Sequence, residues 1–113
     1  MELTLWDEII EKRALLSSCI ESLMEHGIKA SKAEHNYKIA LRKEMYRLRE
    51  DEKVAWTAVA NLSYGDLQVA KLRMDRDIYK VTYDAAQEKI NGLKLELRIL
   101  ESQLNREWGN AVK

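Results

Sequence analysis

The stretch HGIKASKAEH, residues 26–35, decides whether the first half of this chain forms one helix or two. It places Gly27, Ala30 and Ala33 at an i, i+3, i+6 spacing inside a charged, helix-favouring segment. A glycine costs about 1 kcal/mol in a helix interior relative to alanine. Either the helix breaks here, or a neighbouring helix packs too closely for larger side chains. The residues on both sides favour close packing.

Apolar or small side chains recur across this stretch at alternating three- and four-residue steps, except at Arg13, Glu34 and Glu44, where a charged side chain fills the step. The series keeps its phase through the glycine and consists of Ile9, Leu16, Ile20, Leu23, Gly27, Ala30, Tyr37, Leu41 and Leu48. A period near 3.5 residues is typical of a helix that packs along one seam, meaning one line of facing side chains. Thr4, three residues before Asp7, is the predicted N-cap. Together these features predict one helix over about residues 5–49.

A connector follows the charged segment REDE, residues 49–52. Residues 54–62 are expected to form one or two helical turns, with Trp56, Val59 and Leu62 facing inwards. Gly65 is expected to take a left-handed conformation that ends this segment. Asp66 is expected to cap the next helix.

The second long apolar pattern begins directly after this cap. It consists of Leu67, Ala70, Met74, Ile78, Val81, Ala85, Gly92, Leu95 and Ile99, with a neighbouring stripe of Leu97, Leu100, Leu104 and Trp108. This pattern predicts a second helix over about residues 67–108, ending near Gly109.

Two helices of equal length joined by a short connector are expected to fold back antiparallel. The register that best aligns the two series sets Gly27, Ala30 and Ala33 beside Ala85 and Ala86, and Leu23 against Gly92. Small side chains facing one another would let the two backbones approach closely. The sequence therefore predicts an all-α, single-domain protein over residues 1–113, built as a long antiparallel helical hairpin.

Apolar side chains also lie outside the predicted seam, among them Ile10 and Met24 on the first helix. A helix with so broad an apolar face is normally covered by a partner. We expect a second copy of the chain to cover it, which gives a four-helix bundle dimer; a different protein is the alternative. The predicted protein-interface residues are Trp6, Ile10, Leu93, Leu97, Leu100, Leu104 and Trp108.

The composition limits the function classes. Lys plus Arg and Asp plus Glu both total 19, so no overall charge marks a nucleic-acid or membrane binder. No apolar stretch approaches the roughly 18 residues of a membrane span. The N-terminal residues do not resemble a signal peptide, and the single cysteine, Cys19, is read as a small buried side chain in a reducing compartment. We therefore expect a cytoplasmic protein.

No catalytic, cofactor-binding or metal-binding residue is predicted. His26 and His35 share no helical face within ligand distance, and no phosphate-binding glycine motif occurs. The abundant acids are typical of the solvated faces of charged helices. The sequence thus favours a non-enzymatic protein.

A basic cluster near the connector supports a second hypothesis. Its residues are Lys38, Arg42, Lys43, Arg73 and Arg76, with Tyr46, Trp56 and Tyr64 nearby. Basic side chains interleaved with aromatic rings can hold single-stranded nucleic acid. Acidic residues in the same region dilute this charge, so structural ion pairs are the favoured interpretation of the cluster.

The segments KAEHNYKIALRKEMYRLR and RDIYKVTYDAAQEKINGLKLELRILESQLNREW resemble a family of small helical proteins encoded by tailed bacteriophages and prophages, chiefly of Gram-positive bacteria. The resemblance covers roughly residues 27–108. It implies a phage or prophage origin and expression in a bacterial cytoplasm, and it supplies no catalytic residue. The expected function is a non-enzymatic interaction protein that self-associates and binds a phage or host protein. The alternative is a nucleic-acid-associated accessory factor in phage replication or recombination.

Overall fold

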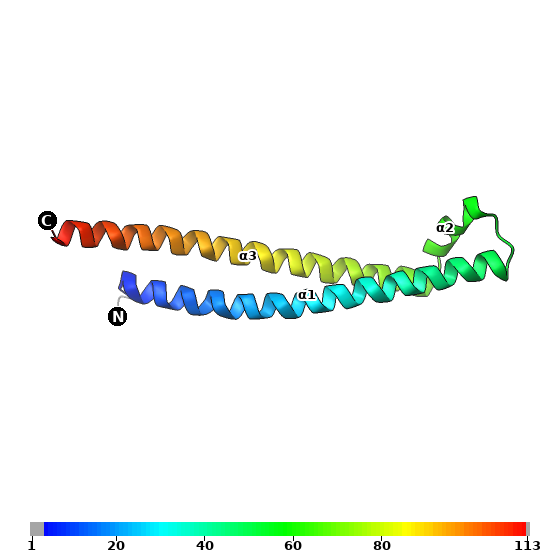
Figure 1. Ribbon diagram of the computed structural model, residues 1–113, viewed down its shortest axis with the longest axis horizontal. Helices are drawn as coiled ribbons and strands as arrows, with labels where there is room; N and C mark the ends of the chain where they lie inside the picture. Colours follow the sequence, from blue (N-terminus) through cyan, green and yellow to red (C-terminus); the bar gives the residue numbers. More distant parts are fainter. Residues whose placement is uncertain (1–3, 113) are drawn as a thin grey trace. The chain divides into compact units, whose positions relative to one another are not determined.

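The structure, a computed structural model, describes residues 4–112, which form three helices: α1 (Leu5–Glu50), α2 (Trp56–Tyr64) and α3 (Leu67–Val112). No strand occurs in this range. Helix α1 is uninterrupted along its length (Figure 1), so the prediction that a single helix passes through Gly27 is confirmed. Helix α3 continues through Gly109, so the predicted end near that residue is wrong. The all-α class and the helical hairpin are confirmed.

The start of α1 is fixed by the capping pair that the sequence indicates. The hydroxyl oxygen of Thr4 accepts a hydrogen bond from the amide of Asp7 at 3.1 Å. The carboxylate of Asp7 accepts hydrogen bonds from the Thr4 hydroxyl at 2.7 Å and from the Thr4 amide at 3.3 Å. These reciprocal bonds satisfy amides that have no partner within the helix.

The connector places its left-handed residue where the sequence did not indicate it. Lys53 has a φ of 56°, and the amide of Val54 donates to the carbonyl of Leu48 at 3.0 Å. Gly65 has a φ of −81°, so the prediction of a left-handed Gly65 is wrong. Its amide donates to the carbonyl of Leu62 at 3.2 Å, which continues the right-handed turn of α2.

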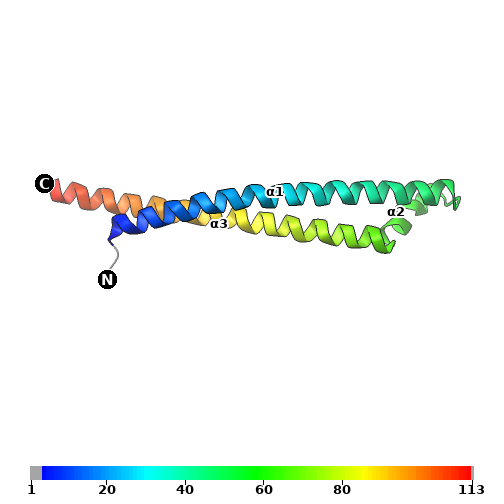
Figure 2. The ribbon, with the colours of Figure 1, turned by 90° about the horizontal axis from the view of Figure 1, so that it is seen from below.

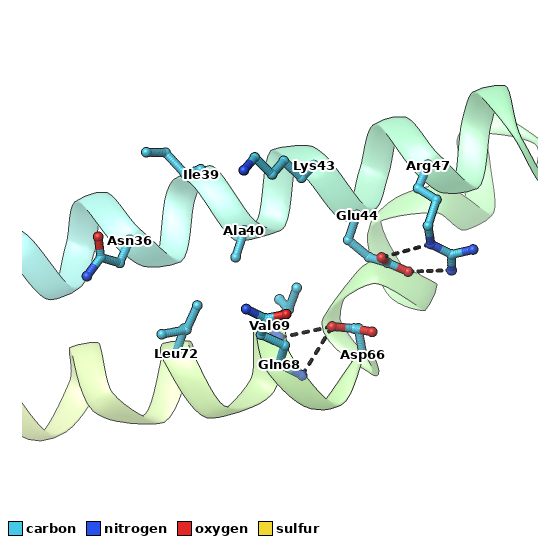
Figure 3. A pocket seen from close by; sticks show the side chains of 10 residues that line it. All are labelled: Asn36, Ile39, Ala40, Lys43, Glu44, Arg47, Asp66, Gln68, Val69 and Leu72. Atoms are coloured by element: carbon cyan, nitrogen blue, oxygen red, sulfur yellow. Dashed lines mark hydrogen bonds and ion pairs between the residues drawn. The ribbon is translucent and has the colours of Figure 1, made fainter.

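Asp66 caps α3 as predicted. Its Oδ2 atom accepts hydrogen bonds from the amides of Gln68 and Val69, both at 3.1 Å (Figure 3). A side-chain cap of this kind stabilises a helix by roughly 1 kcal/mol.

Helix α2 buries one edge only. Val59 and Ser63 are fully buried, and the Ser63 hydroxyl donates to the carbonyl of Val59 at 2.7 Å. Trp56 and Leu62 are exposed, so the prediction that they face inwards is wrong. The guanidinium of Arg49 lies 4.9 Å from the ring centre of Trp56, so this indole contacts a cation instead of the core.

Contacts between residues divide the chain into two units, each made from both long helices. Unit 1 combines residues 4–25 with 84–112, and unit 2 is His26–Tyr83. In unit 2, α2 lies where the chain passes from the end of α1 to the start of α3 (Figures 1 and 2). In unit 1, Lys12 pairs with Glu96 at 2.7 Å and Arg13 pairs with Glu101 at 2.8 Å. The hydrogen bond from Glu96, followed by the attraction of its charge, raises the pKa of Lys12.

The face that α3 turns towards α1 differs from the predicted one. The buried residues of α3 are Val69 in unit 2 and Ile90, Leu93 and Leu97 in unit 1. The residues predicted for the seam are exposed instead: Leu67, Met74, Ile78, Val81, Leu95 and Ile99. The neighbouring stripe, which the sequence analysis recognised only near the C-terminus, is therefore the one that packs. On α1, the predicted seam residues Ile9, Tyr37 and Leu48 are buried, whereas Ile20, also predicted for the seam, is exposed.

A charged side chain explains why the α3 seam in unit 2 was missed. Arg76 is half-buried, with its guanidinium 4.5 Å from the ring centre of Tyr37 and 3.6 Å from the carboxylate of Glu34. It also bonds to Asp77 at 2.9 Å, and that hydrogen bond, ahead of the charge attraction, raises the pKa of Arg76. An arginine in this position interrupts the apolar periodicity that the sequence analysis followed.

The small residues of the opening stretch accommodate an aromatic ring. A Cβ atom built on Gly27 would lie 3.3 Å from Cε2 of Tyr83, so a large aromatic side chain, which the sequence did not indicate, approaches this glycine. A Cβ atom on Gly92 would meet nothing within 4 Å, so the predicted packing of Leu23 against Gly92 is wrong. Gly27 thus allows a large side chain to approach its backbone.

Candidate interaction surfaces

The predicted protein-interface residues fall into two groups in unit 1. Leu93 and Leu97 are only 6% and 7% exposed, and Leu100 and Leu104 are half-buried. All four lie on the stripe of α3 that packs within the hairpin. Leu93 and Leu97 therefore have almost no surface left for a partner.

The remaining predicted residues, Trp6, Ile10 and Trp108, are exposed. Trp6 and Ile10 lie one turn apart on α1. Ile20 lies two heptads after Trp6, and Met24 lies two heptads after Ile10. Both are exposed. Since a two-heptad step returns to nearly the same face of a helix, these four residues form one apolar surface, which we call the α1 stripe.

A second exposed apolar surface lies on α3 in unit 2 and consists of Leu67, Met74, Ile78 and Val81. We call it the α3 stripe. Leu67 is 87% exposed and Val81 is 67% exposed. Val69 and Leu72 of the same helix point towards α1 (Figure 3), and they lie about 140–160° around the helix from Met74. The α3 stripe therefore faces away from α1.

The periodicity of the sequence groups the residues of the α3 stripe correctly on one face, but that face was predicted to lie inside the hairpin. Periodicity shows that residues share a face of a helix; it does not show which of two apolar faces the intramolecular partner takes. The contacts of Arg76 with Tyr37 and of Tyr83 with Gly27 show which face of α3 packs against α1. These contacts join residues far apart in the sequence, so the pattern along one helix does not indicate them.

Two members of the basic cluster are held by acids in unit 2. Arg76 pairs with Glu34 and Asp77, and Lys38 pairs with Glu34 at 3.3 Å. The guanidinium of Arg73 lies 5.5 Å from the ring centre of Tyr64. These three side chains have local partners within the chain.

Arg42 and Lys43 are exposed on α1 beside Tyr46. They line an open depression of about 620 Å³, together with Asp51. Lys43 also borders a second depression between α1 and α3, where Glu44 and Asp66 are close (Figure 3). The structure thus interleaves positive and negative side chains here and does not gather the five basic residues into one patch.

Within 4–112, no group of three or more His, Cys, Asp or Glu side chains is placed to hold a metal ion. Cys19 is a free, half-buried thiol. No helix in this range is long and apolar enough to cross a bilayer.

Comparison with protein-family models, curated proteins and solved structures gave no match. The class of the protein is therefore defined by its own fold and surfaces. It is an all-helical hairpin with two exposed apolar stripes, one on α1 and one on α3.

Proposed function

We propose that this chain is a non-enzymatic helical interaction protein that self-associates and binds a second protein. The observation that supports the proposal is the balance of apolar side chains in residues 4–109, whose burial the structure describes. Nineteen large apolar or aromatic side chains are exposed, whereas only nine apolar side chains are buried. Monomeric proteins rarely expose large contiguous apolar patches, and exposed patches of this kind mark interaction sites.

The two stripes have separate roles in this proposal. The α1 stripe, with the exposed indole of Trp6, binds the second protein, because tryptophan is enriched among the residues that dominate binding energy at interfaces. The α3 stripe supports self-association into a four-helix bundle dimer. The family resemblance adds a phage or prophage origin, a bacterial cytoplasmic location and a partner of phage or host.

Affinity capture from phage-infected bacteria tests the binding of a second protein. The wild-type chain is compared with Ile10→Ser/Met24→Ser, which removes two apolar side chains of the α1 stripe. Leu15→Ser is the matched control, because Leu15 is exposed on the same helix outside the stripe. We expect one protein to be enriched by the wild type and by the control and to be lost with the double variant. Equal recovery with all three baits would contradict a role for the α1 stripe.

The second candidate function is nucleic-acid binding. It is favoured by one feature, the exposed pair Arg42 and Lys43 beside the exposed ring of Tyr46. Cationic side chains next to an aromatic ring can bind the backbone and stack a base of a single strand. Phosphate contacts of this kind would make the affinity fall steeply with salt.

A further inference from the structure

The α3 stripe is centred on Met74. At about 100° per residue, Leu67 and Val81 lie within about 20° of Met74 around the helix, and Ile78 lies about 40° away. All four side chains are more than half exposed. They form a narrow apolar line on the face of α3 that is turned away from α1.

Charged residues border this line in a regular order. Lys71 and Asp75 lie along one edge and Arg73 and Asp77 along the other, each about 60–100° from Met74. Lys71 lies three residues before Met74, and Asp77 lies three residues after it. Arg73 and Asp75 are its immediate neighbours in the sequence, one on each side. The apolar residues are symmetric in the same way, since Leu67 and Val81 are equally far from Met74.

These charges are not paired with one another along the helix. No ion pair joins Lys71 to Asp75, or Arg73 to Asp77, in the part of the chain that the structure describes. Arg73 lies over the ring of Tyr64, and Oδ1 of Asp77 accepts hydrogen bonds from Arg76 at 2.9 and 3.0 Å. Pairing within the helix therefore does not explain their order.

We infer that the α3 stripe is covered by the α3 stripe of a second copy of this chain, antiparallel to it, with the two-fold axis at Met74. This inference rests on the self-association in the proposed function and specifies its geometry. Leu67 of each copy then faces Val81 of the other. Along one edge, Lys71 lies next to Asp75 of the second copy. Along the other edge, Arg73 lies next to Asp77 of the second copy.

The charges distinguish this arrangement from a parallel one. In a two-fold antiparallel pair, each edge meets its own copy run in reverse. Lys71 then lies near Asp75 of the second copy and Arg73 near Asp77, at two places each, while Asp75 and Arg73 each also lie near the same residue of the second copy, at one place each. In a two-fold parallel pair, each edge meets the opposite edge at the same height. Lys71 would then lie near Arg73, and Asp75 would lie near both Asp77 and Arg73. Over both edges, like-charge neighbours outnumber opposite-charge neighbours four to two in the parallel pair, whereas opposite-charge neighbours outnumber like-charge ones four to two in the antiparallel pair. Because like charges placed together at an interface oppose association, the pattern selects the antiparallel pair.

A charge-reversal cycle tests the edge formed by Lys71 and Asp75. This edge is chosen because Arg73, on the other edge, lies over the ring of Tyr64. Lys71→Glu puts two acids together and Asp75→Lys puts two bases together, at two symmetric places in the dimer. We expect each single variant to raise the dissociation constant, measured by sedimentation equilibrium, about tenfold. The double variant Lys71→Glu/Asp75→Lys should return to within about threefold of the wild type. Lys94→Glu, the same charge change elsewhere on α3, is the control and should have little effect.

Cysteine cross-linking tests the direction of the pair, in a Cys19→Ala background whose helicity is first checked by circular dichroism. A mixture of Leu67→Cys and Val81→Cys chains should form a mixed disulfide on oxidation, whereas neither chain alone should cross-link. Two copies of residue 67 would lie about 21 Å apart in the antiparallel pair, far beyond disulfide range. Efficient cross-linking of the Leu67→Cys chain alone would show a parallel pair and overturn the inference.

The outcomes also separate this inference from the proposed function. A dimer whose charge variants show no recovery and whose mixed cysteines do not cross-link would retain self-association but place it on another surface. A chain that is monomeric with full helicity would overturn both. Dimerisation that is weakened in both single variants and restored in the double variant supports both.

Discussion

The ring of Tyr83 lies against the backbone of Gly27, where an added Cβ atom would be 3.3 Å from Cε2. The same addition at Gly92 would meet no atom within 4 Å. Both glycines lie in helix interiors, so both carry a similar cost in helix propensity. The two positions therefore separate the effect of packing from that of propensity.

Gly92→Ala should stabilise the protein by about 0.8–1 kcal/mol, because alanine is the better helix former and the added methyl group has space. Gly27→Ala should yield clearly less, or destabilise, because the Tyr83 ring has to move by a few tenths of an ångström. The free energy of unfolding in urea measures both changes. In a Tyr83→Leu background, Gly27→Ala should recover most of the gain. Equal stabilisation by the two glycine substitutions in the wild type would show that the close contact is absent.

In the connector, removing one glycine and introducing another should both stabilise the protein. Gly65→Ala should stabilise the protein by about 0.4–1 kcal/mol, because Gly65 has a right-handed φ and its Cβ would make only an ordinary contact with the Leu62 carbonyl, at 3.5 Å. Lys53→Gly should also stabilise it, by about 0.5–1 kcal/mol, because glycine tolerates the left-handed φ of 56°. Thermal unfolding checks both. Destabilisation by Gly65→Ala would indicate the left-handed glycine that the sequence predicts.

Asp66→Ala should destabilise the protein by roughly 1 kcal/mol, because the amides of Gln68 and Val69 lose their acceptor. Asp66→Asn keeps a side-chain oxygen and should retain most of the stability. Urea unfolding of the two variants beside the wild type measures the difference. A similar loss for alanine and asparagine would mean that the cap contributes little.

The nucleic-acid alternative makes a residue-specific prediction. If it holds, a fluorescent single-stranded oligonucleotide binds at low salt, and Arg42→Gln/Lys43→Gln weakens that binding at least about tenfold. Arg76→Gln should have a smaller effect, because Arg76 is already bonded to Asp77 and paired with Glu34. Fluorescence anisotropy across a salt series measures these affinities. Absence of binding at the lowest salt would exclude the alternative.

Local signals in the sequence predicted the elements of the fold well. The phase of the apolar residues through Gly27 predicted α1, and Thr4 and Asp66 predicted two helix starts. These features depend on residues a few positions apart. The extra helical turn of α3 beyond Gly109 was missed because an isolated glycine lowers helix propensity without forcing an end.

The choice between faces of α3 could not be made from local signals. Its two apolar stripes have similar spacing, and the packed stripe contains Arg76, which a sequence pattern assigns to solvent. Stacking on Tyr37 and pairing with Glu34 make this position tolerable for an arginine. Because the wrong face of α3 was predicted to pack, Leu93 and Leu97 were predicted to lie at the protein interface, although they are buried within the hairpin. The prediction that Trp6, Ile10 and Trp108 are exposed did not depend on which face of α3 packs.

Sedimentation equilibrium of the wild type and of Met74→Ser, run side by side at micromolar concentrations, measures whether the α3 stripe holds two chains together. We expect a wild-type mass of twice the 13.2 kDa chain. Met74→Ser should dissociate to the single-chain mass while keeping its helical circular dichroism, because Met74 is exposed in the single chain. A wild-type chain that stays at 13.2 kDa with full helicity would contradict the claim that its exposed apolar stripes serve self-association.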